Sequence, residues 1–246
     1  MKIFYHIGRY FILLSKVFSR PEKTKIFLKA VVREMDNLGI NSLGIVIIIS
    51  VFMGAVITLQ TAYNLENPLI PTYLVGLTAR DSMILEFSST IVGLILAGKV
   101  GSNIASEIGT MRISEQIDAL EIMGVNSASH LILPKIIGAV LINPFLTIIS
   151  IFVGIFGGYL ATVFTGAITP DSYIYGIHYV FIPFYITYAL VKTVVFAFII
   201  TSVPAYHGYY SSGGALEVGR ASTMAVVYSS VLILLFNVLL TQLMLA

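Results

Sequence analysis

The sequence predicts an all-α, polytopic membrane protein with five transmembrane helices, an N-terminal interfacial helix and a short helix in a cytoplasmic connection. Hydrophobic residues make up 57% of the 246 residues and charged residues only 11%, whereas soluble domains carry charge on roughly a quarter of their residues. Five apolar stretches are each near or above the roughly 20 residues that cross a bilayer as a helix. Eight of the fourteen Lys and Arg residues precede the first of these stretches.

Residues 1–40 are predicted to form a basic interfacial region. The apolar segment 3–14 is interrupted by His6 and Arg9 and is followed by no small-residue cleavage pattern, so a secretory signal is a poor interpretation. After Pro21, apolar residues recur at helical spacing with basic residues between them, which suits a helix lying on an anionic membrane surface. The eight basic residues are Lys2, Arg9, Lys16, Arg20, Lys23, Lys25, Lys29 and Arg33.

Residues 41–246 are predicted to form one membrane domain. Its expected spans are 43–62, 82–100, 136–164, 177–205 and 222–245. The third and fourth exceed the minimum length, and Pro144 and Pro183 are natural places for a kink. With the N-terminus in the cytoplasm, the inner side also holds Lys99, Arg112, Lys135 and Arg220, and the outer side holds only Arg80. This asymmetry predicts a cytoplasmic N-terminus and a periplasmic C-terminus.

The connection between the second and third spans has an ordered pattern. From Ile108 to Met123, apolar residues alternate with the acids Glu115, Asp118 and Glu121, and Gly124 is placed to end a helix. A cytoplasmic helix with apolar anchors and an acidic rim suits docking of a soluble partner. Two alternatives stay open, an ordinary solvated helix and a divalent-cation or acid/base site formed by the three acids.

Longer motifs connect the chain with a known family. The run EIGTMRISEQIDALEIMGV, with LAGKVGS before it and LILPK after it, resembles the signature of the MlaE/YrbE family, the permease subunits of ABC transporters that work with mammalian-cell-entry (MCE) lipid-carrying proteins. The resemblance continues through VKTVVFAF (191–198), VGRAST (218–223) and AVVYSS (225–230), and covers nearly all of the chain after Lys25.

The resemblance implies a homodimeric permease in the bacterial inner membrane. It would move phospholipids between that membrane and a periplasmic MCE-protein conduit, maintaining the lipid asymmetry of the outer membrane. ATP hydrolysis would take place in a partner ATPase subunit, present in two copies, and a small accessory cytoplasmic protein is a further candidate partner. Residues 107–124 would be the coupling segment on the ATPase. Its expected contact residues are Glu107, Met111, Arg112, Glu115, Gln116, Asp118 and Glu121.

Charged residues inside spans are the best candidates for the transport path, because a lone charge in the bilayer generally faces a cavity or a partner. Glu86 and Lys192 are such residues. Glu86 could meet an amine headgroup, pair with Lys192 or Arg80, or stabilise a dimer, and Lys192 could attract a phosphate. The neutral candidates for the lipid cavity are Gln60, Tyr63 and Asn64, although tyrosine at this depth is also typical of an aromatic belt.

The second span departs from the family pattern. Members commonly carry Arg-Glu-Leu-Gly-Pro where this chain has Leu85-Glu86-Phe87-Ser88-Ser89. The acid remains but the preceding arginine is missing, so any role of that arginine in relatives does not transfer to Leu85.

Several functions are disfavoured by the sequence. The run from Gly93 to Lys99 has the spacing of a phosphate-binding loop, but Val100 replaces the required Ser or Thr and the glycines lie in a hydrophobic helix, so no nucleotide site of the chain's own is expected. Four scattered histidines and no cysteine give no reason to expect a metal site, a cofactor or enzyme catalysis, and the net charge of +2 gives none to expect nucleic acid. The rival interpretations are a partner-free secondary transporter or channel that uses Glu86 and Lys192 as a proton or ion relay, and a scaffold that only anchors partners.

Overall fold

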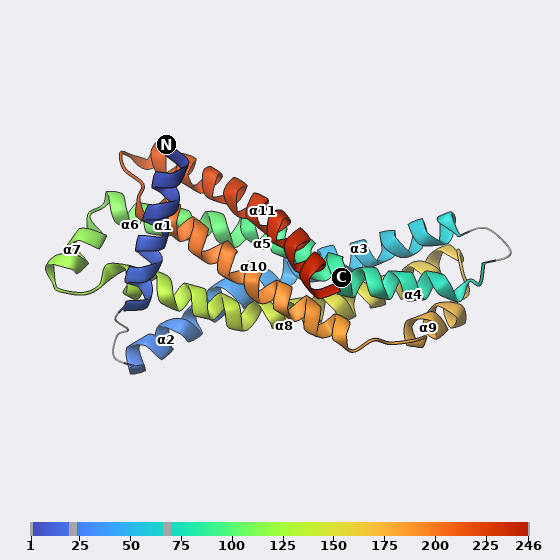
Figure 1. Ribbon diagram of the computed structural model, residues 1–246. Coiled ribbons are helices and arrows are strands. Elements are labelled where there is room, and N and C mark those ends of the chain that lie inside the picture. The colour runs from blue at the N-terminus through green and yellow to red at the C-terminus, as the bar shows by residue number, and fades with distance from the viewer. Residues whose placement is uncertain (1, 20–23, 66–69, 246) are drawn as a thin grey trace. The chain divides into compact units, whose positions relative to one another are not determined.

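The computed structural model describes residues 2–19, 24–65 and 70–245, and within them every regular element is a helix (Figure 1). The all-α prediction is therefore confirmed. Two of the eight N-terminal basic residues, Arg20 and Lys23, lie outside the described residues, as does the side chain of Lys2. The elements are α1 (Lys2–Ser19), α2 (Thr24–Met35), η1 (Asp36–Ile40), α3 (Asn41–Asn64), α4 (Tyr73–Ser82), η2 (Met83–Ile91), α5 (Val92–Leu96), η3 (Ala97–Gly101), α6 (Ser102–Ile113), α7 (Gln116–Ile122), α8 (Ser127–Thr165), α9 (Pro170–His178), α10 (Phe184–Tyr209) and α11 (Ala215–Leu245).

Five stretches of the described chain are long and apolar enough to cross a membrane. They are Lys25–Asn64, Tyr73–Ile113, Ser127–Thr165, Phe184–Tyr209 and Ala215–Leu245. At 1.5 Å per residue, the 39 residues of α8 extend about 58 Å, well beyond a hydrocarbon core of about 30 Å. The number of spans agrees with the sequence prediction, and the helices extend past the predicted ranges because their hydrogen bonding continues outside the apolar stretches.

The two candidate kink sites behave differently. Helix α8 continues through Pro144, whereas residues 179–183 are non-helical between α9 and α10. The expected span 177–205 therefore begins later, at Phe184. The physical reason is Pro183, which lacks an N–H for a preceding helical turn and disfavours helical backbone at residue 182.

Among the described residues, three stretches have π-helical backbone, η1, η2 and η3. The longest, η2, carries Glu86. Turns of this kind are rare and frequently occur at functional sites, because the additional residue in the turn changes the direction in which side chains project. The backbone thus marks the part of the second span where the sequence departs from the family pattern.

By their internal contacts the described residues form two compact units. The first contains residues 1–41, 93–143 and 194–246, and the second contains residues 42–92 and 144–193. In the first unit, α1 packs on α10 through a bond between His6 Nδ1 and Tyr206 Oη of 2.7 Å and one between Tyr10 Oη and Ser202 Oγ of 2.7 Å. The guanidinium of Arg9 lies 3.7 Å from the centre of the Tyr210 ring.

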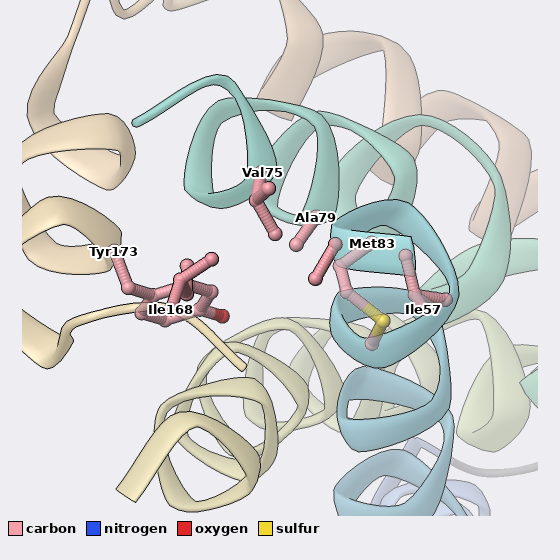
Figure 2. Packing of buried hydrophobic residues seen from close by; sticks show 7 residues of the cluster. Ile57, Val75, Ala79, Met83, Ile168 and Tyr173 are labelled. Atoms are coloured by element: carbon pink, nitrogen blue, oxygen red, sulfur yellow. The ribbon is translucent and has the colours of Figure 1, made fainter. Parts of the chain in front are cut away.

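The second unit has a hydrophobic cluster contributed by α3, α4, η2 and α9 and by the segment before α9. Figure 2 shows its side chains, with the Ile168 side chain against the Tyr173 ring and Met83 beside Ile57. Tyr173 is fully buried, and its hydroxyl donates to the carbonyl of Ile155 at 3.0 Å. The tyrosine's polar end is thus satisfied inside the apolar cluster.

Close helix contact in the second unit depends on glycine. A Cβ on Gly54 of α3 would overlap the carbonyl group of Gly154 of α8. Beside this contact, Ser50 and Ser150 join their hydroxyls at 2.7 Å. Small residues that allow backbones to meet, with hydroxyls bonding across, are typical of membrane helix pairs. Gly154 of α8 thus lies where the backbones of α3 and α8 approach each other closely.

Candidate functional site

The two charged residues predicted inside spans form an ion pair in the second unit. Lys192 of α10 is 0% exposed, and its Nζ lies 3.0 Å from Glu86 Oε1, 3.0 Å from the carbonyl oxygen of Leu85 and 3.1 Å from Tyr188 Oη. An ammonium group has three donors, so these three oxygens satisfy the lysine. The structure thus contains the Lys192 pairing that the sequence left as one of several alternatives for Glu86.

The ion pair is asymmetric in its exposure. The side chain of Glu86 is 40% exposed, whereas that of Lys192 is completely covered. The other carboxylate oxygen of Glu86, Oε2, accepts a bond of 3.1 Å from Thr90 Oγ1. A molecule approaching this surface would therefore meet the carboxylate and not the ammonium.

Glu86 borders a groove of about 320 Å³ in the second unit. Aliphatic and aromatic side chains form most of its surface, and two carboxylates and two hydroxyl groups add polarity. The lining residues are Leu77, Thr78, Asp81, Ser82, Leu85, Glu86 and Phe87. Leu85 contributes an apolar wall.

The neutral cavity candidates are not part of this groove. Gln60, Tyr63 and Asn64 lie at the end of α3 and are exposed, Tyr63 to 74%, and none lines the groove. Of the five cavity candidates, the structure therefore brings together Glu86 and Lys192 and leaves the other three separate from this pair.

Arg80, which the sequence placed as the sole basic residue of an outer loop, lies instead in α4 and is almost fully buried. Its Nη1 donates to the carbonyls of Ile177 at 2.7 Å and Tyr179 at 2.9 Å, and its Nη2 donates to that of Val180 at 3.1 Å. Its Nε bonds Asp81 at 2.8 Å. Arg80 thus caps the end of α9 and holds Asp81 at the groove.

The predicted single helix ending at Gly124 is divided in two. Helix α6 ends at Ile113, and α7 starts at Gln116 after Glu115, whose φ of 61° is left-handed. Glu115 therefore does not share a regular helical face with Asp118 and Glu121, which removes the geometric basis for the alternative of a cation or acid/base site formed by the three acids. Gly124 does end α7, with a φ of 77°.

Most of the polar candidates in 107–124 have partners in the first unit. Glu107 and Glu34 both bind the buried Lys135 Nζ, at 2.8 and 2.9 Å, and Arg112 binds Asp118 at 2.5 Å. Gln116 donates to Ser114 at 3.1 Å, Met111 is half-buried and Glu115 is exposed. Of the acids in this segment, Asp118 and Glu107 are therefore ion-paired within the chain, whereas Glu115 is exposed. The Glu107 pair was not visible in the sequence because Lys135 comes from another helix.

The apolar residues of this segment divide into two groups. Ile108 and Ile117 are completely buried, whereas Ile122 and Met123 are 88% and 67% exposed. The exposed pair lies at the end of α7, next to the turn at Gly124. An exposed apolar tip with polar neighbours is typical of a surface that contacts a protein partner.

The surroundings of Glu121 lower the pKa of its carboxyl group. Hydrogen bonds from Ser127 Oγ at 2.8 Å and Tyr209 Oη at 2.9 Å lower the pKa of its carboxyl group below the ordinary value of 4.5, with a smaller lowering contribution from the charge of Arg112. Glu121 is thus ionised at neutral pH and acts only as an acceptor.

Comparison with known proteins decides the family. The family described as Permease MlaE matches residues 31–243. The chain belongs to the MlaE permease family. The match includes all five candidate spans apart from their outermost residues and the whole α6–α7 segment. This assignment confirms the resemblance that the motifs indicated, and it makes the chain a multi-pass permease subunit of the ABC transporter type.

Individual MlaE-like relatives extend over nearly the whole chain. A probable ABC transporter permease protein of Rickettsia prowazekii (strain Madrid E) is 36% identical, over 95% of this chain and 88% of its own length. The intermembrane phospholipid transport system permease protein MlaE of Haemophilus influenzae is 30% identical, over 95% and 89%. The chloroplastic protein trigalactosyldiacylglycerol 1 of Arabidopsis thaliana is 31% identical, over 89% of this chain and 63% of its own length.

Proposed function

We propose that this MlaE-family chain is the membrane-spanning subunit of an ATP-driven phospholipid transporter. It would move phospholipid between the inner membrane and a periplasmic MCE-protein conduit, and so maintain the lipid asymmetry of the outer membrane. The observation that carries the proposal is the family match over 31–243, together with the name of the Haemophilus influenzae relative, which is an intermembrane phospholipid transport permease.

The groove beside Glu86 supports a lipid path. Its walls are mainly apolar, which suits acyl chains, and Glu86 offers a charged group for a headgroup. Lys192 holds the carboxylate in place from the buried side at 3.0 Å. Glu86 and Lys192 are therefore proposed to line the path, and Gln60, Tyr63 and Asn64 are proposed to meet lipid near the end of α3.

The α6–α7 segment supports contact with an ATPase. Ile122 and Met123 project from the end of α7 with little cover from the chain itself. We propose that they insert into the partner and that the exposed Glu115 and Gln116 lie at the edge of the contact. In this arrangement residues 107–124 are the coupling segment, and movement of the partner on ATP binding would displace it.

The assembly and its orientation follow from the family resemblance and the charge pattern. We propose a homodimer with two ATPase subunits on the cytoplasmic side, an MCE protein on the periplasmic side and, as a further partner, a small accessory cytoplasmic protein. Twelve of the fourteen Lys and Arg residues lie on the side proposed to be cytoplasmic. The basic N-terminal region 1–40 is proposed to lie at that membrane surface.

The test compares the purified chain with the reconstituted complex. Phospholipid should copurify with the chain, and ATP hydrolysis should appear only when the ATPase subunit is added. ATP hydrolysis by the purified chain alone would contradict the proposal, as would failure to recover any ATPase or MCE protein with the chain from native membranes.

A further inference from the structure

Helix α7 is a short element between two left-handed backbone positions. Glu115 precedes it with a φ of 61°, and Gly124 follows it with a φ of 77°. At its end, the N–H of Val125 donates to the carbonyl of Leu120 and the N–H of Gly124 donates to that of Glu121, both at 3.0 Å. This is the Schellman arrangement, which ends a helix in a defined geometry. The chain therefore changes direction on both sides of α7.

Three side chains meet where α7 ends, and we call them the α7 latch. Glu121 Oε1 accepts from Ser127 Oγ at 2.8 Å and from Tyr209 Oη at 2.9 Å, and the two hydroxyl oxygens are 2.8 Å apart. Ser127 is the first residue of α8 and Tyr209 the last residue of α10, and both are buried. A carboxylate that accepts from two buried hydroxyls makes charge-assisted hydrogen bonds, which are stronger than bonds between neutral groups.

The contact of Glu121 with Tyr209 joins residues much farther apart in the sequence than the other polar contacts of α7 do. The Asp118 pair with Arg112 and the Glu121 bond to Ser127 each join residues six apart in the sequence, whereas Glu121 and Tyr209 are 88 apart. The latch therefore ties α7 to α10, a transmembrane helix that is distant in the chain. The outward-facing Ile122 and Met123 follow Glu121 directly, so a force on them acts beside the latch.

We propose that Tyr209 is a positioning residue for energy coupling in the permease. Its hydroxyl, together with that of Ser127, fixes the end of α7 against the end of α10, so that displacement of α7 by the ATPase is passed to α10. The inference rests on the function proposed above, in which the exposed end of α7 meets the ATPase. Without the Tyr209 hydroxyl, α7 would still bind the partner but would move independently of α10.

The test uses the complex of the chain with its ATPase in phospholipid vesicles and measures both ATP hydrolysis and transfer of fluorescent phospholipid. Tyr209→Phe should retain ATP hydrolysis and lower the phospholipid transferred per ATP about tenfold, as expected for loss of a hydrogen bond to a charged group. Tyr228→Phe is the matched control, because it removes a hydroxyl from a half-exposed tyrosine of α11 that stacks on His207. It should leave the ratio unchanged.

A second pair of measurements separates positioning from a general loss of stability. The chain contains no cysteine, so Ala119→Cys, at an exposed position of α7, accepts a single spin label. The label should become more mobile with Tyr209→Phe or Ser127→Ala, and should be unaffected by Tyr228→Phe. If Tyr209 and Glu121 act through one contact, Glu121→Gln combined with Tyr209→Phe should lower the ratio less than the product of the two single effects.

Two results would overturn the inference, an unchanged ratio of phospholipid to ATP with Tyr209→Phe, or single effects of Tyr209→Phe and Glu121→Gln that multiply in the double variant. Failure of the proposed function would be recognised separately, because the unaltered complex would then transfer no phospholipid on ATP addition. In that case, a spin label at Ala119→Cys that is no more mobile in Tyr209→Phe than in the unaltered chain would still overturn the positioning role of Tyr209.

Discussion

At the residue scale, the ion pair of Glu86 and Lys192 is unequal. The side chain of Lys192 is completely buried, whereas that of Glu86 is 40% exposed. Loss of one partner therefore has a different consequence for each residue. Removing the glutamate leaves a fully buried ammonium without its counter-charge, whereas removing the lysine leaves a carboxylate that is only partly buried. The role of the glutamate in stability is therefore to neutralise the lysine.

This asymmetry predicts unequal effects of substitution. Glu86→Ala should lower the free energy of unfolding by about 3 kcal/mol, at the low end for breaking a buried pair because the Leu85 carbonyl and Tyr188 hydroxyl still accept from Lys192. Lys192→Met should cost less, and combining the two should restore part of the loss. Thermal unfolding followed by circular dichroism measures this order, since the chain has no tryptophan. A larger loss with Lys192→Met than with Glu86→Ala would contradict it.

Glu121 predicts a pH dependence of stability. Because the Ser127 and Tyr209 hydroxyls lower its pKa in the folded chain below the ordinary value of 4.5, its contribution is complete above that value and is lost as the pH falls through the lowered pKa. Glu121→Gln should therefore reduce the melting temperature at pH 7, and the difference from the unaltered chain should shrink as the pH is lowered below 4.5. A difference that stays constant down to pH 3 would count against these hydrogen bonds.

At the element scale, the contact between α3 and α8 depends on backbone proximity at Gly54. Gly54→Ala should destabilise the chain by about 1–3 kcal/mol, because the new methyl group would overlap the Gly154 carbonyl. Gly44→Ala in the same helix is the matched control, since a Cβ there meets nothing within 4 Å. Alanine favours helix, so this control should stabilise by about 0.5–1 kcal/mol. Equal melting temperatures for Gly54→Ala and Gly44→Ala in detergent would contradict a close backbone contact between α3 and α8 at Gly54.

The division of residues 107–124 into two helices shows which features a sequence pattern can and cannot predict. The period of the apolar residues and Gly124 predicted a helix and its end, because both depend on neighbours along the chain. The break after Ile113 was not predictable, since a left-handed φ at Glu115 is unusual for a residue with a side chain. Burial of Ile117 and the bond of Asp118 to Arg112 stabilise this break, and these contacts require the folded structure.

At the scale of the whole molecule, composition and hydrophobic runs were sufficient for the fold class and the five spans, and the motifs were sufficient for the family. Among partners distant in sequence, the Glu86–Lys192 pair was predicted only as one of several alternatives, and others were not predicted. Arg80 donates to carbonyls of residues 177, 179 and 180, almost 100 residues further along the chain. Lys135 forms ion pairs with Glu34 of α2 and with Glu107 of α6. A lone arginine followed by an aspartate in an apolar stretch was the signal that could have marked Arg80 as buried and paired.

The charge asymmetry predicts a definite topology, which labelling can test because the chain has no cysteine of its own. Ala119→Cys in α7 should react with a membrane-impermeant maleimide only from the cytoplasmic side. Asn64→Cys, exposed at the end of α3, should react only from the periplasmic side. Reaction of both from the same side would be inconsistent with five spans and a cytoplasmic N-terminus.

In the function proposed above, the chain moves phospholipid with energy from a separate ATPase subunit. The most direct measurement is the transfer of labelled phospholipid between vesicles holding the reconstituted complex and an MCE-protein acceptor, with and without ATP. Transfer should require both ATP and the ATPase subunit, and should fall strongly when Ile122 and Met123 are replaced by aspartate, although the chain remains folded. Transfer that proceeds equally without the ATPase, or that is insensitive to these substitutions, would contradict the account.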